Sequence, residues 1–110
     1  MAYIKHHSIV ITALEPVFIK NLIVFCKSID LKFIGPSKDM MNDYRTICIP
    51  PDGSKEGWED SQIGDRKREL LKRWLKSCEK SGIFFDWVEV SYSPDNKKSL
   101  IVDDAWGCLG

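Results

Sequence analysis

"PPDGSKEGWED", residues 50–60, divides the chain into two halves of similar design and thereby decides the fold. It is the densest cluster of turn-forming and charged residues in the sequence, and it carries an aromatic residue, Trp58. Asp52-Gly53-Ser54 is typical of a tight turn. The stretch contains no complete catalytic signature. We therefore expect a loop that launches a helix and presents side chains at the surface.

The residues after this loop predict a helix from about Ser61 or Gln62 to Lys80. One apolar stripe recurs at helical spacing and consists of Ile63, Leu70, Leu71, Trp74, Leu75 and Cys78. Acidic residues crowd the start of this segment and basic residues crowd its end, as the helix dipole favours. Gly82 is placed to terminate the helix.

The half before the loop predicts a strand, a helix and two further strands. The β-branched run 8–13 is typical of a central strand, and Pro16 suits the first turn of a helix over about 17–29. This helix is apolar beyond a single stripe, so we expect it to be largely buried or to cover a partner. Segments 32–37 and 44–49 predict an antiparallel hairpin, whose first strand lies at an edge because it contains a Gly-Pro pair.

The half after the helix predicts two paired strands, at 85–92 and 99–102. The order β-α-β-β-α-β-β indicates an α+β two-layer sandwich: a ferredoxin-like β-α-β-β-α-β arrangement with an extra C-terminal strand. Two helices would cover one face of a mainly antiparallel sheet, and all 110 residues would form a single domain. The uncovered sheet face is a natural place for a partner or a second subunit, with Phe33, Trp87 and Trp106 near it.

Composition restricts the class of partner. Sixteen basic and sixteen acidic residues leave no net charge, so no long-range field attracts nucleic acid or an anionic membrane, and we expect neither partner. The longest apolar run, 22–26, is too short to span a bilayer, and the N-terminus lacks the pattern of a secretory signal. We expect a cytoplasmic protein. Its four cysteines are scattered singly, which favours buried or inert thiols over a metal site, and we expect no cofactor.

The loop is the first candidate binding site. Its candidate residues are Asp52, Gly53, Ser54, Lys55, Glu56, Trp58 and Glu59. Backbone N–H groups and Lys55 would suit a phosphate, but five acidic residues face one basic residue from Asp52 to Asp65, which disfavours an anion. The carboxylates are oxygen donors for Mg²⁺ or Ca²⁺, although the calcium-loop spacing is absent. The alternative is structural: the acids complement the helix dipole and Trp58 packs on the core.

A basic stripe on the second helix is the next candidate. Arg68, Lys72 and Lys76 recur at intervals of four within a segment that has seven basic and two acidic residues, 66–80. Unpaired like charges at this spacing destabilise a helix, so something acidic is expected to offset them. The acidic loop, Asp103-Asp104, a protein partner or a nucleic-acid backbone would each serve, and a solvated face is the commonest explanation.

No catalytic constellation is evident in the sequence. The two histidines, His6 and His7, lie near the N-terminus, and no serine, histidine and aspartate form a recognisable triad pattern. No cysteine has a base close to it in sequence. We therefore assign no catalytic residue, and an enzyme is unsupported.

Several runs resemble a family of small phage and prophage proteins with no assigned activity. They are "IKHHSIVITA" at 4–13, "PDGSKEGWEDS" at 51–61, "GDRKRELLKRWL" at 64–75 and "FDWVEVSYSPD" at 85–95. The second run is the specific one. The resemblance extends from about Tyr3 to Asp95 and is weaker in the first helix and after Asn96. It implies a context and no catalytic residue: accessory proteins of phages commonly bind and disable a host nuclease, a defence complex or a nucleotide signal.

The leading hypothesis is a small accessory binding protein that antagonises a host protein or defence factor by occupancy. Its contacts would be residues 52–59, followed by the basic stripe, and it would form a homo-oligomer or bind a host protein. The second hypothesis is a protein that binds or sequesters a nucleotide, with Ser54, Lys55 and Trp58 clamping phosphate and base. The third is a small nucleotide enzyme using a metal held by the loop carboxylates.

Overall fold

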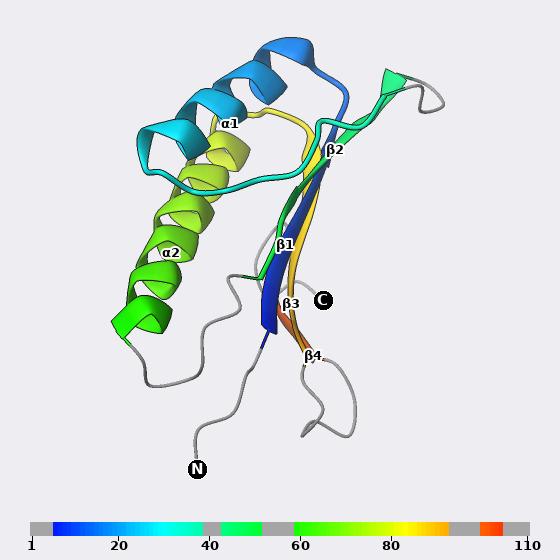
Figure 1. Cartoon of the computed structure of the whole chain (residues 1–110). Coiled ribbons are helices and arrows are strands. Elements are labelled where there is room, and N and C mark those ends of the chain that lie inside the picture. Colours follow the sequence, from blue (N-terminus) through cyan, green and yellow to red (C-terminus); the bar gives the residue numbers. More distant parts are fainter. Residues whose placement is uncertain (1–5, 39–42, 52–58, 93–99, 105–110) are drawn as a thin grey trace.

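A single antiparallel sheet covered by two helices forms the described part of the chain. The computed structural model describes residues 6–38, 43–51, 59–92 and 100–104. Its elements are β1 (His6–Ala13), α1 (Pro16–Ser28), β2 (Arg45–Ile49), α2 (Glu59–Lys80), β3 (Phe85–Tyr92) and β4 (Leu100–Asp104). The strand order is β2-β1-β3-β4, and both helices lie on one face of the sheet (Figure 1). The predicted α+β class is therefore confirmed.

Local features of the chain begin α1 and end both helices. Pro16 is at the first position of α1, where its missing N–H costs no helical bond. After α1, Asp30 has a positive φ of 55°, which turns the chain so that Leu31 N donates to Cys26 O at 2.8 Å. Gly82, with a φ of 85°, turns the chain after α2 in the same way.

The core lies between the helices and the sheet. Alternation along β1 directs Ile9 and Ile11 to the helices, and Ile11 has Ile47 and Trp87 as its cross-strand neighbours. Phe18 of α1 stacks on Trp74 of α2 and on Phe85 of β3, with ring centroids 5.6 and 4.4 Å apart. The buried apolar residues are Ile9, Ile11, Ala13, Phe18, Ile19, Leu22, Cys26, Ile47, Ile49, Leu71, Leu75, Phe85 and Trp87.

The predicted edge strand at 32–37 is wrong in extent, because it is reduced to one bridge between Ile34 and Cys48. Gly35 has a φ of 110°, outside the extended region, and a Cβ there would lie 2.6 Å from the carbonyl oxygen of Thr46, so only glycine fits at this position. Pro36 has no N–H to continue a ladder. Without a full strand here, and with β4 added beyond β3, the sheet differs in strand order from an ideal ferredoxin-like fold.

The expected position of Trp87 near the uncovered sheet face is also wrong. Phe85, Trp87, Glu89 and Ser91 of β3 face the helices and are buried, whereas Val88 and Val90 lie on the other face. The Trp87 indole N–H donates to Glu79 of α2. Phe33 packs partly against the core, and Trp106 is outside the described residues.

The apolar stripe of α2 is narrower than its sequence indicates. Leu71 and Leu75 are fully buried, but Ile63 and Leu70 are 43% and 44% exposed. Two charged residues, Arg68 and Lys72, are buried on the sheet side instead. Glu89 on the inner face of β3 accounts for this exchange, because a buried carboxylate requires cationic partners and finds them on α2.

Candidate functional site

The loop that the sequence singles out lies almost wholly outside the described residues. Asp52, Gly53, Ser54, Lys55, Glu56 and Trp58 are in the range that the structure does not describe. Glu59 is the first residue of α2. A binding role for these residues therefore stays a prediction.

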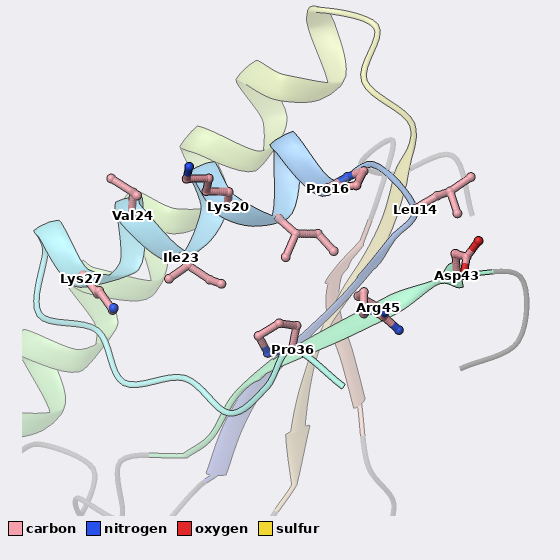
Figure 2. A pocket seen from close by; sticks show the side chains of 10 residues that line it. Leu14, Pro16, Lys20, Ile23, Val24, Lys27, Pro36, Asp43 and Arg45 are labelled. Carbon is pink, nitrogen blue, oxygen red and sulfur yellow. The ribbon is translucent and has the colours of Figure 1, made fainter. Parts of the chain in front are cut away.

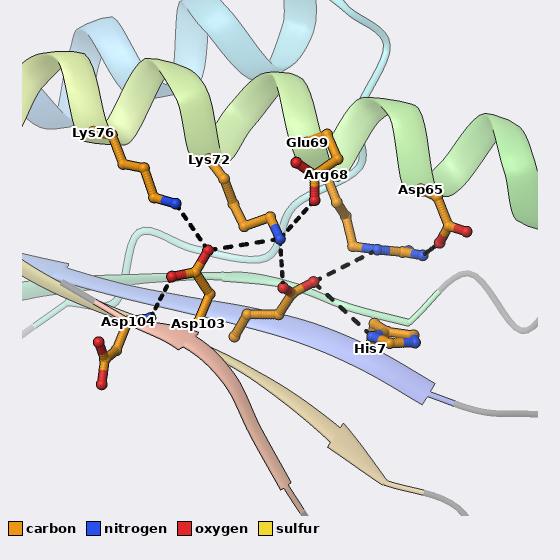
Figure 3. Close-up of polar contacts among 9 residues, drawn as sticks. His7, Asp65, Arg68, Glu69, Lys72, Lys76, Asp103 and Asp104 are labelled. Carbon is orange, nitrogen blue, oxygen red and sulfur yellow. Dashed lines mark hydrogen bonds and ion pairs between the residues drawn. The ribbon is translucent and has the colours of Figure 1, made fainter. Parts of the chain in front are cut away.

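The basic stripe faces the sheet and is paired within the chain. Figure 3 shows Arg68, Lys72 and Lys76 directed from α2 toward β3 and β4. Arg68 and Lys72 are only 6% and 7% exposed, whereas the Lys76 side chain is 46% exposed. Asp103, one of the acids that we expected to offset the stripe, accepts a hydrogen bond from Lys76 Nζ at 3.1 Å.

Glu89 is the centre of this ion cluster. It is 3% exposed, and its Oε1 accepts a hydrogen bond from Lys72 Nζ at 2.8 Å. Arg68 Nε and His7 Nδ1 each lie 4.0 Å from Oε2 (Figure 3). Arg68 also pairs with Asp65, one turn earlier on α2. The carboxylate is thus surrounded by cationic groups from the helix and a histidine from the neighbouring strand.

Lys72 also holds two further carboxylates. Its Nζ lies 2.7 Å from Glu69 and 3.8 Å from Asp103. Burial alone would lower the pKa of Lys72, but the hydrogen bonds to Glu69 and Glu89 outweigh burial and raise that pKa above its ordinary value. Lys72 therefore stays charged and joins α2 to the inner face of the sheet. These ion pairs indicate that Lys72 stabilises the packing of α2 on the sheet and is not available to bind a partner.

The cluster includes a serine and a histidine, yet their geometry does not favour nucleophilic catalysis. Ser91 is the cross-strand partner of His7, beside Glu89 on the same face of β3. Within the described part of the chain, the Ser91 Oγ makes no hydrogen bond, and it is buried from solvent. An activated serine needs a hydrogen-bonded base and access for a substrate. Ser91 has neither here.

Ser91→Ala should leave the free energy of unfolding unchanged or raise it by about 1 kcal/mol, because it removes a buried hydroxyl without a partner. Urea unfolding of the two proteins measures this difference. A matched Ser8→Ala variant should be destabilised by about 1 kcal/mol, because the Ser8 Oγ donates to Ile49 O at 3.0 Å. A loss of stability on Ser91→Ala as large as that on Ser8→Ala would contradict the assignment.

A second candidate site is a groove between α1 and β2, which we call the α1 groove. It has a volume of about 830 Å³, in the range of ligand and peptide sites. Figure 2 shows Ile23 and Lys27 along the α1 side and Pro36 and Arg45 along the other. The lining residues are Leu14, Pro16, Ile19, Lys20, Ile23, Val24, Lys27, Pro36, Asp43 and Arg45.

The α1 groove combines an apolar floor with a cationic rim. Val24 is 59% exposed and Leu14 is 49% exposed, although both are aliphatic. Among the described residues that line the groove, Lys20, Lys27 and Arg45 supply three positive charges against the one carboxylate of Asp43. Across the described ranges, none of these three cations makes an ion pair. Unlike the stripe on α2, these cations have no ionic partner in the part of the chain that the structure describes, and they could meet the charges of a binding partner.

The residues that line the α1 groove were not among the binding residues predicted from the sequence. A signal for them was present, since the apolar surface of the 17–29 segment is too wide for one buried stripe. Burial accounts for Phe18 and Leu22, whereas Val24 remains at the surface. The part that Pro36 and Arg45 play in the groove could not be predicted from the sequence, because it depends on how β2 and the segment before it are placed beside α1 (Figure 2).

The thiols and the possible metal ligands are arranged as follows. Cys26 is fully buried, and burial raises its pKa to about 11, so its reactive thiolate form is suppressed. Burial also raises the pKa of Cys78, with a contribution from Glu79. In the ranges that the structure describes, no three histidine, cysteine or acidic side chains converge on a point that could hold a metal.

Neither described helix is long and apolar enough to cross a membrane.

The two sites thus have different characters. The cations of the ion cluster are paired with carboxylates of the same chain, whereas the α1 groove has exposed apolar side chains and cations that pair with no described residue. The groove is the better candidate for binding. Comparison of the chain with protein-family models, curated proteins and solved structures found no match.

Proposed function

We propose that this protein is a small accessory binding protein that acts by occupying a host protein and not by turnover, with the α1 groove as its main contact surface. The observation that carries the proposal is the cavity of about 830 Å³ with an apolar floor and free cations at its rim. Folded proteins rarely leave such a combination uncovered unless something binds there. The phage-like sequence runs support an antagonist of a host protein or defence factor as the kind of binder.

Site-specific photocrosslinking in the native cell tests this proposal. A photoreactive residue replacing Val24, which is exposed in the groove, should yield a discrete protein adduct. The matched control replaces Asp86, which is exposed on β3 on the opposite face of the sheet. An adduct at position 24 and none at position 86 is expected. Adducts at position 86 alone, or at neither position, would overturn the proposal.

The occupancy mechanism has its own measurement. The crosslinked partner is identified by mass spectrometry, purified and assayed for its own activity with increasing amounts of this protein. Inhibition should saturate at a fixed ratio of this protein to partner, because one groove covers one site. Substoichiometric, time-dependent inactivation would show turnover and would contradict occupancy.

A further inference from the structure

We infer that the α1 groove receives an amphipathic helix of the partner that carries aliphatic side chains flanked by carboxylates. This inference rests on the proposed function, since it specifies which part of the partner makes contact. Three features of the groove support it: the pattern along α1, the backbone bonding of the opposite wall, and the sign of the free charges.

Along α1, the residues that line the groove recur at a spacing of seven. Lys20 and Lys27, which both line the groove, are seven residues apart, and the apolar lining residues Pro16 and Ile23 have the same spacing. Seven residues correspond to two turns, or about 10 Å along the axis. A helix laid alongside α1 repeats its own side chains with the same period, so the apolar lining residues of α1 would meet aliphatic side chains and each lysine a carboxylate.

The opposite wall excludes strand addition as the binding mode. An extended peptide would need the outer edge of β2, but Ile34 already bonds there: Ile34 N donates to Cys48 O at 2.7 Å, and Cys48 N donates to Ile34 O at 2.9 Å. Ser37 N likewise donates to Thr46 O at 3.0 Å. These backbone groups are therefore not available to a new strand, whereas a helix needs none of them, because its bonds are internal.

The free charges set the sign of the partner. Lys20 and Lys27 on α1 and Arg45 on β2 outnumber Asp43, so carboxylates beside the aliphatic stripe would be attracted and cations repelled. A second copy of this chain docked by its own α1 would place Lys20 and Lys27 against the same lysines. That repulsion disfavours self-association through the groove.

Two synthetic helical peptides of about 15 residues test the inference. Both carry leucines along one face; one has glutamates flanking the stripe, and the other has lysines at the same positions. Fluorescence anisotropy with the full chain should show binding of the glutamate peptide, weakening as salt is added, and at least tenfold weaker binding of the lysine peptide. Equal affinity for the two peptides, or no binding of either, would overturn the inference.

Charge reversal in the groove sharpens the test. Lys20→Glu/Lys27→Glu should reverse the preference, so that the lysine peptide binds about tenfold better than the glutamate peptide. The control Arg66→Glu/Arg73→Glu changes the net charge equally, at two exposed positions with the same spacing on α2, and should keep the wild-type preference. A control that reverses the preference as strongly would show that overall charge, and not the groove, selects the peptide.

Failure of this inference is distinguishable from failure of the proposed function. A partner crosslinked at position 24 through a segment that is not an acidic helix would refute the inference and leave the binding function standing. Sedimentation of the wild-type protein adds the remaining outcome. A dimer that Val24→Asp dissociates would show that a second copy occupies the groove, which would also refute the inference.

Discussion

Glu89→Leu should lower the free energy of unfolding by about 3 kcal/mol, although it places an apolar residue at a buried position. The reason is that Lys72, itself nearly buried, loses the carboxylate 2.8 Å away and keeps only Glu69 and the more distant Asp103. Urea or thermal unfolding followed by circular dichroism measures the change.

A double-mutant cycle separates the ion pair from simple burial. Lys72→Met should also destabilise, because it leaves Glu89 and its cross-strand neighbour Asp103 without the shared cation. The double variant Glu89→Leu/Lys72→Met should recover most of the loss, since neither buried charge remains. Additive losses would contradict the pairing. Lys76→Met, at a half-exposed position on the same stripe, is the control and should cost less than about 1 kcal/mol.

The same cluster predicts how stability depends on pH. The pKa of Lys72 is higher in the folded state than in the unfolded state. The contribution of Lys72 to the free energy of unfolding is therefore complete below its unfolded pKa of about 10.4, and it is lost as the pH rises through its folded pKa. In urea unfolding at a series of pH values, the wild-type protein should therefore lose stability as the pH rises above about 10.4. The Lys72→Met variant lacks this group and should show a smaller loss over the same range.

Phe18→Ala should destabilise the protein by about 4 kcal/mol, the second large effect. Phe18 is 2% exposed and stacks between Trp74 and Phe85, so alanine leaves a cavity where α1, α2 and β3 meet. The denaturation midpoint should fall with little change in the denaturant dependence. The fluorescence of Trp74 should change as well.

Two companion variants make the Phe18 result specific. Phe18→Leu retains most of the volume and should cost less than about 1.5 kcal/mol. Phe25 also stacks on Trp74, at 5.2 Å between centroids, but it is only partly buried, so Phe25→Ala should cost less than Phe18→Ala. Equal losses for the two alanine variants would show that the aromatic stack, and not the three-way junction, carries the stability.

The strands and helices follow from local patterns, and this explains why most of them were predictable. Period-two alternation and β-branched residues mark β1 and β3, and a period of 3.6 marks α2. Pro16 and Gly82 bracket helices through the fixed or permissive φ of their own backbones. The segment around Gly35 is not a full strand, because the positive φ of Gly35 leaves the extended region and Pro36 has no N–H to continue a ladder.

Which side of β3 faces inward was not deducible from its alternation. Val88 and Val90 look like the core face, and yet Trp87, Glu89 and Ser91 point to the helices. Alternation with a period of two shows that the two faces of a strand differ, but it does not show which face packs against the helices. Here the helices bury the aromatic rings of Phe85 and Trp87 on the same face, and Lys72 of α2 pairs with the carboxylate of Glu89, which would otherwise be costly to bury.

The sequence by itself determined the α+β class, both helices, the four strands of the sheet and the excess apolar surface on the first helix, but not the absence of a full strand at 32–37. The features that it determined depend on neighbours along the chain. Only the tertiary structure decided that Lys72 belongs to an internal cluster and that Lys20, Lys27 and Arg45 gather at one groove, where none of them pairs with another described residue. Charge is visible in a sequence, but whether a charge is paired depends on residues brought close by folding, such as Glu89 beside α2. The α1 groove exists because β2 and Pro36 are placed beside α1, a juxtaposition that no local pattern encodes.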